Sequence, residues 1–377
     1  MGLRVGDSQI MDRSLRVAVT LEQCWHRVPG GTATSALQSV AAVQRDGRVQ
    51  QIGVSAHHRS APDPAFAPSI EVKQLPLPRL AMYELWQQFR IGKVQRATGA
   101  VDVIHATGMA VPPKSAPLVV TVHDLHFRHE PQRFTKRGLR FFDKAIALAK
   151  KDADVVICPS PTTLAQCVAD GFRQEKLRVV PWGVDAEPVS ESTVAGVRAR
   201  YGLDRPYVLW AGTIEPRKNL PRLLDAFSRL SVAHTLVLAG PQGWNESIER
   251  QLAALGEKVK AIGFVDQPTL RALYAGADVF AFPSLAEGFG LPIAEAMVQK
   301  TAVLTSSKTA TADVAGDAAV VVDPTDVDAI ASGLQELLED DALRARFAES
   351  GYTRAITEFS LQQCADKLVS VYEEVAR

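Results

Sequence analysis

Residues 278–297 are DVFAFPSLAEGFGLPIAEAM, and they predict a strand, a turn and a helix in that order. The apolar run at 279–282 is typical of a buried strand, and Pro292 suits the first turn of the helix that follows. The turn between them contains Gly288 and Gly290. A buried strand that leads directly into a helix is the repeating unit of parallel α/β sheets.

Two carboxylates flank this loop: Glu287 lies before it, and Glu295 lies one helical turn inside the helix that follows. Free backbone N–H groups and the positive end of the helix favour a phosphate there. Carboxylates only accept hydrogen bonds, so they suit sugar hydroxyls and not the phosphate itself. A phosphate flanked by hydroxyls is the chemistry of a nucleotide sugar. An ordinary strand-to-helix turn with two solvated glutamates is the alternative interpretation.

Strand and helix patterns alternate along nearly the whole chain, after a loose extension at residues 1–14. Candidate strands lie at 16–20, 51–55, 101–106, 118–122, 155–158 and 178–180, and then at 207–211, 235–239, 259–262, 279–282, 302–305 and 319–322. About six strands in each half predict two doubly wound α/β domains facing across a cleft, because strands separated by helices form parallel sheets. We expect domains at 1–185 and 186–358, and a C-terminal helix at 359–377 that packs back toward the first domain.

The net formal charge of the 377 residues is zero, but the two halves differ. Residues 1–185 contain 24 Lys and Arg against 16 Asp and Glu, and residues 186–377 contain 18 against 26. The basic half favours an anionic partner or surface, whereas the acidic half argues against nucleic acid, for which the chain has no binding motif.

The four cysteines show no metal-ligand spacing, which favours reduced thiols in a cytoplasmic protein. No apolar run approaches the length of a membrane span, and the N-terminus has no signal-peptide core. We therefore expect a soluble or peripheral protein.

The loop after the strand at 207–211 places Arg217 and Lys218 at the start of a helix predicted at 220–230. Cations there oppose the helix dipole unless an anion lies between them. The planar fork of Arg217 and the point charge of Lys218 together suit a diphosphate. A solvated basic pair is the alternative.

Two further loops follow predicted strands. Gly30 and Gly31 open a helix that runs through Gly47, and consecutive glycines allow close approach of a ligand, although they also occur in common turns. His123, followed by Asp124, ends another strand and suits contact with a sugar ring or proton transfer. A capping or core histidine is the alternative for His123. His105 has a weaker claim of the same kind, and His57 and His58 are expected at the surface.

Residues 133–151 interleave cations with aromatic side chains. From residue 128 to residue 151 there are eight cations and two anions. Such a helix can lie peripherally on an anionic membrane, here the inner face of the cell membrane. Alternatively, it can pack its aromatic side into the protein core, and the sequence leaves both interpretations open.

With these residues, the chain resembles the retaining glycosyltransferases of the two-Rossmann-domain (GT-B) architecture, family 4, over nearly its whole length. Gly-Thr-Ile-Glu-Pro-Arg-Lys-Asn at 212–219 and Val-His-Asp-Leu at 122–125 are most similar to bacterial mannosyltransferases that build surface polysaccharide or lipid-linked glycans. The matching segments are Gly30-Gly31, His123-Asp124, Pro159-Ser160, 182–185, 212–219, 263–265, 287–295 and 313–318.

The resemblance implies a role for each matching residue. Arg217 and Lys218 would neutralise the donor diphosphate, and Glu295 would bind the ribose hydroxyls. Glu287 and His123 would bind the transferred hexose, and the four residues His123, Arg217, Lys218 and Glu287 are the expected catalytic set. The remaining expected donor contacts are Gly31, Gly212, Gly263, Phe264 and the backbone amides of Phe289, Gly290 and Leu291.

The implied reaction moves a hexose, with mannose from GDP-mannose expected first, to a hydroxyl of a glycan or lipid-linked acceptor. The resemblance also implies that no metal is needed, because family members need none. We therefore expect no cofactor besides the nucleotide-sugar co-substrate. A nucleotide-sugar epimerase and a non-catalytic nucleotide-sugar-binding protein on the same scaffold remain the alternatives.

Overall fold

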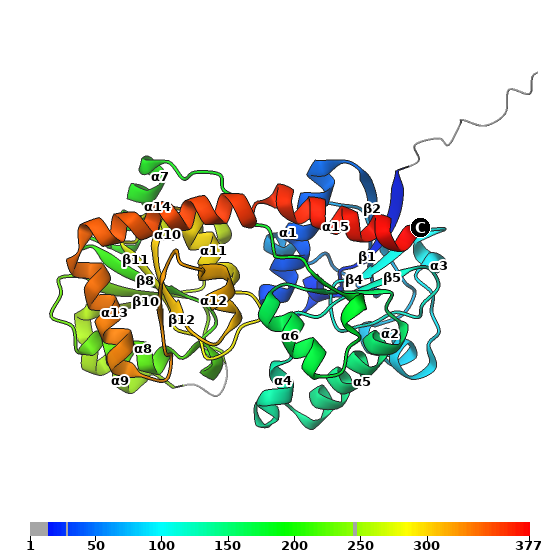
Figure 1. The fold of residues 1–377 in the computed structure, drawn as a ribbon, viewed down its shortest axis with the longest axis horizontal. Coiled ribbons are helices and arrows are strands. Elements are labelled where there is room, and N and C mark those ends of the chain that lie inside the picture. The colour runs from blue at the N-terminus through cyan, green and yellow to red at the C-terminus, as the bar shows by residue number, and fades with distance from the viewer. Residues whose placement is uncertain (1–13, 28, 244–246) are drawn as a thin grey trace, which may run out of the picture.

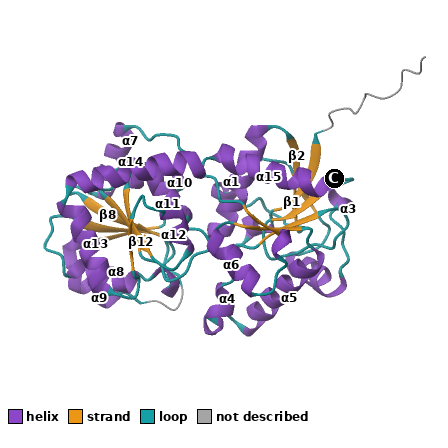
Figure 2. Ribbon diagram, in the orientation of Figure 1, coloured by secondary structure: helices purple, strands orange, loops and turns teal. Residues whose placement is uncertain are grey.

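The computed structural model describes residues 14–27, 29–243 and 247–377, so the predicted extension at 1–14 falls almost entirely outside the described residues. The chain forms two lobes, each built around a parallel sheet with helices on its outside (Figure 1 and Figure 2). The expected α/β class with two doubly wound sheets is confirmed.

The first sheet has the strand order β3-β2-β1-β4-β5-β6-β7, and all its pairs are parallel. Its strands are β1 (Leu15–Thr20), β2 (Val49–Ser55), β3 (Val72–Gln74), β4 (Val103–Ala106), β5 (Leu118–Thr121), β6 (Val155–Cys158) and β7 (Leu177–Val179). The sequence predicted six of these seven. It missed β3, because this edge strand has three half-exposed or exposed residues and so no apolar run.

The helices of this lobe are α1 (Gly30–Asp46), α2 (Arg79–Glu84), α3 (Gln95–Thr98), α4 (His126–His129), α5 (Lys136–Asp152) and α6 (Pro161–Ala169). Helix α1 ends as predicted at Gly47, which takes the left-handed conformation (φ 78°). Helix α5 is the basic amphipathic helix of the sequence. Its Phe142 stacks on Phe127, and both belong to the core of the first lobe. Lys136, Arg137 and Arg140 are exposed.

The second sheet has the order β10-β9-β8-β11-β12-β13, again with parallel pairs. Its strands are β8 (Tyr207–Ala211), β9 (Thr235–Ala239), β10 (Val259–Gly263), β11 (Val279–Phe282), β12 (Ala302–Ser306) and β13 (Val320–Val322). Its helices are α7 (Glu191–Tyr201), α8 (Leu220–Ser228), α9 (Glu249–Leu255), α10 (Gln267–Ala275), α11 (Leu291–Val298), α12 (Ala310–Ala315), α13 (Val327–Glu339) and α14 (Asp341–Glu358).

The final helix, α15 (Leu361–Ala376), leaves the second lobe and lies along the first (Figure 1). It contacts α1, β1, β4 and β5. The hydroxyl of its Tyr372 is hydrogen-bonded to Nδ1 of His105 at 2.8 Å. The predicted boundary at 185/186 falls between the last strand of the first sheet and the first strand of the second, and it stays a prediction.

The four cysteines are free and buried. Within the described ranges, no helix is both long enough and apolar enough to cross a membrane.

Candidate active site

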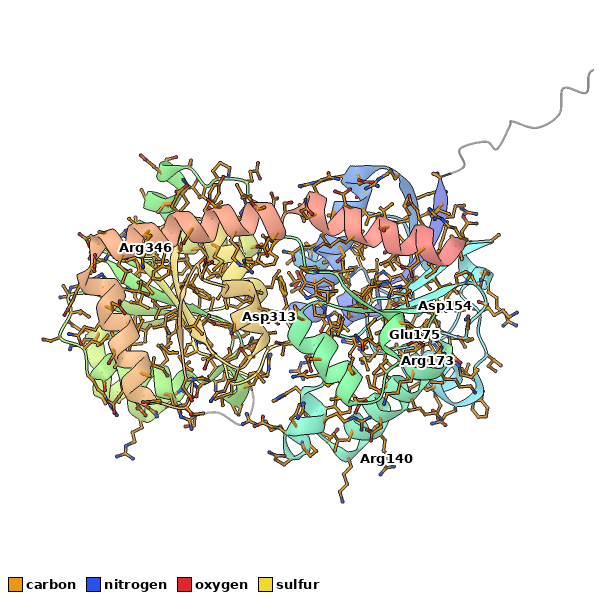
Figure 3. The ribbon with its side chains drawn as sticks, in the orientation of Figure 1. Arg140, Asp154, Arg173, Glu175, Asp313 and Arg346 are labelled. Atoms are coloured by element: carbon orange, nitrogen blue, oxygen red, sulfur yellow. The ribbon has the colours of Figure 1, made fainter. Side chains whose placement is uncertain are left out.

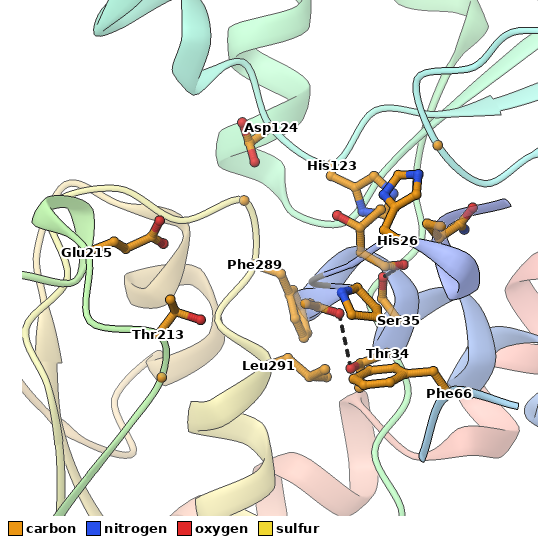
Figure 4. A pocket seen from close by; sticks show the side chains of 18 of the residues that line it. His26, Thr34, Ser35, Phe66, His123, Asp124, Thr213, Glu215, Phe289 and Leu291 are labelled. Atoms are coloured by element: carbon orange, nitrogen blue, oxygen red, sulfur yellow. Dashed lines mark hydrogen bonds between the residues drawn. The ribbon is translucent and has the colours of Figure 1, made fainter. Parts of the chain in front are cut away.

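A cleft of about 1530 Å³ lies between the two lobes and is lined by both of them. Figure 4 shows His26 and His123 of the first lobe opposite Thr213, Glu215, Phe289 and Leu291 of the second. In each sheet the strand order reverses at one place, between β1 and β4 and between β8 and β11. Loops after the carboxyl ends of strands at such points form the usual ligand site of open α/β sheets. Residues from the loops after all four of these strands line the cleft.

The loops after β8 and β11 meet through ion pairs. Arg217 donates from Nη1 to Oε2 of Glu287 at 2.7 Å, and Lys218 donates from Nζ to Oε1 of the same carboxylate at 2.7 Å. Arg217 also donates from Nη2 to Glu215 at 2.6 Å. In this structure the carboxylate of Glu287 therefore lies between the two cations, where an anion was expected, and Glu215 pairs with Arg217 alone. Since two cations face two carboxylates, the cluster has no net formal charge. A bound diphosphate then depends on directed N–H donors more than on net charge.

These ion pairs change the pKa values of their members. Burial alone would raise the pKa of Glu287, but Arg217 and Lys218 outweigh it and lower the pKa to about 2. Burial and the neighbouring Arg217 lower the pKa of Lys218. Burial alone would lower the pKa of Arg217, but Glu287 and Glu215 raise it. Glu287 is therefore ionised at neutral pH.

The glycine turn presents unused backbone donors. In the described part of the chain, the N–H groups of Phe289, Gly290 and Leu291 donate to no protein acceptor. Gly290 precedes α11 with φ 109°, a conformation that favours glycine. Phe289, Gly290 and Leu291 line the same cleft as Arg217 and Lys218. This arrangement matches an anion site at a helix N-terminus.

Glu295, in α11, has different surroundings from Glu287. Gln267 donates to Oε1 at 3.0 Å and the Tyr274 hydroxyl donates to Oε2 at 3.4 Å. Glu295 makes no ion pair with any described residue, and burial raises its pKa to about 7. Its carboxylate lines the cleft and is available to accept hydroxyl protons.

His123 lies on the opposite wall, in the first lobe. Its Nε2 is 2.7 Å from the carbonyl oxygen of Thr107, which can only accept, so Nε2 carries the proton. Burial lowers the pKa of His123, although the bond to Thr107 opposes this. The ring is therefore neutral, and Nδ1 is left as an acceptor for a hydroxyl.

Most of the other predicted donor contacts also line the cleft. Gly31 lies at the start of α1, where an added Cβ would meet no atom within 4 Å, and Gly212 follows β8. Phe264 is 63% exposed at the rim. Gly263 does not line the cleft: its carbonyl accepts from the N–H of Gly240, a cleft-lining residue, at 2.8 Å. The structure thus places Gly263 behind the site and not in it.

The remaining histidines that the sequence analysis singled out lie outside the cleft lining. His105 is buried between Tyr372 and Thr121, each 2.8 Å from a ring nitrogen. His57 is exposed as expected, but the expectation for His58 is wrong. His58 lies 3.0 Å from both carboxylate oxygens of the buried Glu22 and stacks on Trp25, because that carboxylate requires a partner.

Sequence reasoning missed Glu215 and the first-lobe wall of the cleft, where Glu22, His26 and Tyr83 lie. Glu215 stands directly before Pro216-Arg217-Lys218, so its charge next to the two cations was a usable signal. No comparable signal marks the wall residues, since they come from separate loops. Among the described residues, no group of three or more His, Cys, Asp or Glu has an arrangement that could hold a metal ion.

Comparisons with known proteins agree with this geometry. A family model described as Glycosyltransferase Family 4 matches residues 29–188, and one described as Glycosyl transferases group 1 matches residues 198–354. The O-antigen chain mannosyltransferase B of Escherichia coli is 31% identical over 285 residues, which are 72% of this chain and 74% of that protein. An MMP alpha-(1->4)-mannosyltransferase of Mycolicibacterium hassiacum is 29% identical over 300 residues, 73% of this chain and 71% of that protein.

Solved structures show the same fold. The crystal structure of Anabaena HepE in complex with UDP and glucose has a TM-score of 0.76 at 21% identity and covers 96% of this chain and 100% of that one. WaaG, a glycosyltransferase involved in lipopolysaccharide biosynthesis, has a TM-score of 0.73 at 19% identity, with 94% and 99% covered.

Proposed function

Because the chain belongs to the family 4 glycosyltransferases and has their two-sheet GT-B fold, we propose that it transfers mannose from GDP-mannose to a hydroxyl of a glycan or lipid-linked acceptor. One observation carries the proposal: Arg217 and Lys218 line the same cleft as the three unused amides at the start of α11, and both lobes contribute to that cleft. This is a site for a diphosphate with a sugar on either side.

The choice of mannose is supported by two relatives that are named mannosyltransferases. HepE is a structural neighbour in complex with UDP-glucose, so a UDP-hexose is the competing donor. In the proposed complex Glu295 accepts protons from the ribose hydroxyls. Glu287, held by both cations, accepts protons from hexose hydroxyls with its remaining lone pairs.

The chemical step separates the anomeric carbon from a phosphate oxygen, and negative charge develops on the departing diphosphate. Arg217, Lys218 and the amides of the turn are fixed in place before this charge appears, which is the electrostatic route to rate. Neutral His123 accepts from a hexose hydroxyl at Nδ1. The acceptor proton is taken by a donor phosphate oxygen on the same face, and the anomeric configuration is retained. No metal takes part in this scheme.

The acceptor lies against the first lobe. Tyr83 and Phe141, whose ring centres are 5.4 Å apart, line that wall together with Phe142. Exposed Leu80 and Phe89 in the same lobe, together with the cations of α5, suit contact with an anionic membrane on its cytoplasmic side. Sedimentation with vesicles of phosphatidylglycerol, and not with phosphatidylcholine alone, is the expected result for this contact.

The donor assignment is tested by incubating the protein with GDP-mannose, UDP-glucose and other nucleotide sugars and following release of the nucleoside diphosphate. We expect GDP-mannose to be turned over fastest, with an undiminished rate in excess EDTA. Thermal unfolding with each nucleotide gives an independent ranking, because ligands of the folded state raise its melting temperature. Turnover confined to UDP-hexoses, or lost in EDTA, contradicts the donor or the metal-free scheme respectively.

A further inference from the structure

The glycine turn of the second lobe is held by two hydroxyls of the first lobe. Ser160 Oγ and Thr163 Oγ1 each donate to the carbonyl oxygen of Gly288 at 2.9 Å. Ser160 is 1% exposed and Thr163 is fully buried. Ser160 Oγ also lies 3.1 Å from Thr163 Oγ1, so the two hydroxyls and this carbonyl form one hydrogen-bonded cluster. Buried hydroxyls are costly without partners, and this cluster supplies them.

The start of helix α6 fixes the position of these two hydroxyls. Ser160 caps α6, its Oγ accepting from the N–H of Thr163 at 3.0 Å. The next free amide of this turn, that of Thr162, donates to Oδ2 of Asp313 in α12 at 2.9 Å. Figure 3 shows Asp313 between the lobes, where α12 faces α6. The first turn of α6 therefore docks on the second lobe through three hydrogen bonds.

The turn is also held from its own lobe. Arg217 accepts at its carbonyl from the N–H of Leu285 at 2.8 Å and donates from Nη1 to the carbonyl of Ala286 at 3.1 Å. Residues 285–286 are thus fixed by the second lobe, and Gly288 by the first. A Cβ on Gly288 would lie 1.9 Å from the carbonyl oxygen of His123, so the lobes meet here at backbone distance.

The carbonyl of Gly288 and the N–H of Phe289 belong to one planar trans peptide, in which they point in opposite directions. Hydroxyls that hold the carbonyl toward α6 therefore direct the N–H of Phe289 away from α6. We infer that Ser160 and Thr163 are positioning residues for the donor diphosphate: they act from the acceptor-side lobe and orient the Phe289 amide that receives it. The diphosphate site is complete only while α6 is docked, so both lobes set donor affinity. This inference rests on the proposed function.

The test compares phosphate-dependent with phosphate-independent affinity. Thr163→Val keeps the shape of the side chain and the cap by Ser160 but removes one hydroxyl. We expect about tenfold weaker binding of GDP by calorimetric titration, the effect of one hydrogen bond, with UDP titrated in parallel. Guanosine and uridine lack the diphosphate, so their inhibition constants should not change. Thr163→Ser should restore GDP affinity.

Helix α7 supplies the matched control. Ser190 caps α7 and accepts from the N–H of Thr193 at 3.2 Å, the same Ser-x-x-Thr arrangement at an exposed helix start. Thr193→Val should therefore bind GDP as the wild type does. If Thr163→Val does not fold, Ser160→Gly removes the other hydroxyl, and glycine is tolerated at a helix N-cap almost as well as serine.

The outcomes separate the two proposals. A wild-type protein that binds neither GDP nor UDP contradicts the proposed function. Wild-type binding that Thr163→Val and Ser160→Gly leave unchanged overturns the positioning role alone. An equal loss for guanosine and GDP also overturns it, because the effect then does not pass through the diphosphate.

Discussion

The two glutamates that flank the turn differ in what balances their charge. Glu287 is held by Arg217 and Lys218 and has a pKa of about 2, whereas Glu295 has hydrogen bonds but no ion pair among the described residues and a pKa of about 7. The first is ionised at every working pH. The second changes its charge near neutrality, so any ligand that needs its ionised form must bind with a pH dependence.

Ribose hydroxyls that donate to Glu295 favour its ionised form. We therefore expect the affinity for GDP-mannose to rise by up to about tenfold from pH 6 to pH 8. The reason is that only about a tenth of the Glu295 carboxyl groups are ionised one pH unit below the pKa. The diphosphate diester keeps its charge over this range. Glu295→Gln should bind weakly with no such slope. Titration calorimetry at four pH values measures both, and a parallel slope in the variant contradicts the assignment.

The same shift affects the stability of the free protein. The folded pKa of Glu295 is raised from 4.5 to about 7, so between these values the folded state holds the proton more tightly than the unfolded state. Its contribution to stability is complete below pH 4.5 and is lost as the pH rises to 7. Relative to the wild type, Glu295→Gln should gain stability from pH 5 to pH 8 in urea unfolding.

The contribution of the Lys218 charge can be tested by substitution. Lys218→Ala removes a donor to the diphosphate and leaves Glu287 with Arg217 alone. We expect turnover to fall by about 100-fold or more, the usual cost of a lost charge-stabilising donor. Glu287→Ala should be similarly impaired through loss of hexose contact. Lys367→Ala, on the exposed face of α15, is the control. Near-normal rates in both site variants would refute the site.

At the scale of elements, the sequence predicts what lies within one strand–loop–helix unit. The pattern predicts Arg217, Lys218 and Glu287 in loops that follow strands, and Glu295 in the first turns of the next helix. Ligand sites follow the carboxyl ends of parallel strands, so these side chains were expected in one site. Contacts between the lobes were not predictable in this way. Nothing in Ser160-Pro-Thr-Thr shows that its hydroxyls meet a carbonyl more than a hundred residues later, since the partner depends on how the domains dock.

The turn itself gives an element-scale prediction. Gly288→Ala places a Cβ against the carbonyl of His123, and backbone on both sides leaves little freedom to yield. The lobes must move apart there, which also separates Gly288 from Ser160. We expect a protein that folds but turns over donor at least about 100-fold more slowly, since misplacement by about 1 Å has that cost. Gly196→Ala, in the exposed α7 with open space around it, controls for loss of glycine.

At the scale of the whole molecule, the chain crosses between the lobes at two places that touch. The N–H of Val184 donates to the carbonyl of Phe359 at 2.7 Å, so the linker before α7 and the start of α15 form one hinge. The ring of Phe359 also packs edge-on against Phe289, with centroids 5.5 Å apart at 87°. The hinge is therefore in direct contact with the turn that we propose binds the diphosphate.

Phe359→Leu keeps the hinge apolar but removes this edge-to-face contact, which is worth about 0.5–1.5 kcal/mol beyond the area it buries. If this contact stabilises the arrangement in which α6 is docked, its loss lowers the population of that arrangement and donor turnover falls. The fall is at most about tenfold, because a population cannot shift by more than the lost contact energy allows. Phe347→Leu, on α14 against the core of the second lobe, is the matched control for a lost ring. Turnover and melting temperature are measured together for both variants. If the two variants are equally destabilised but only Phe359→Leu loses turnover, the hinge takes part in the catalytic cycle. If their turnover is equal, the hinge has no such role.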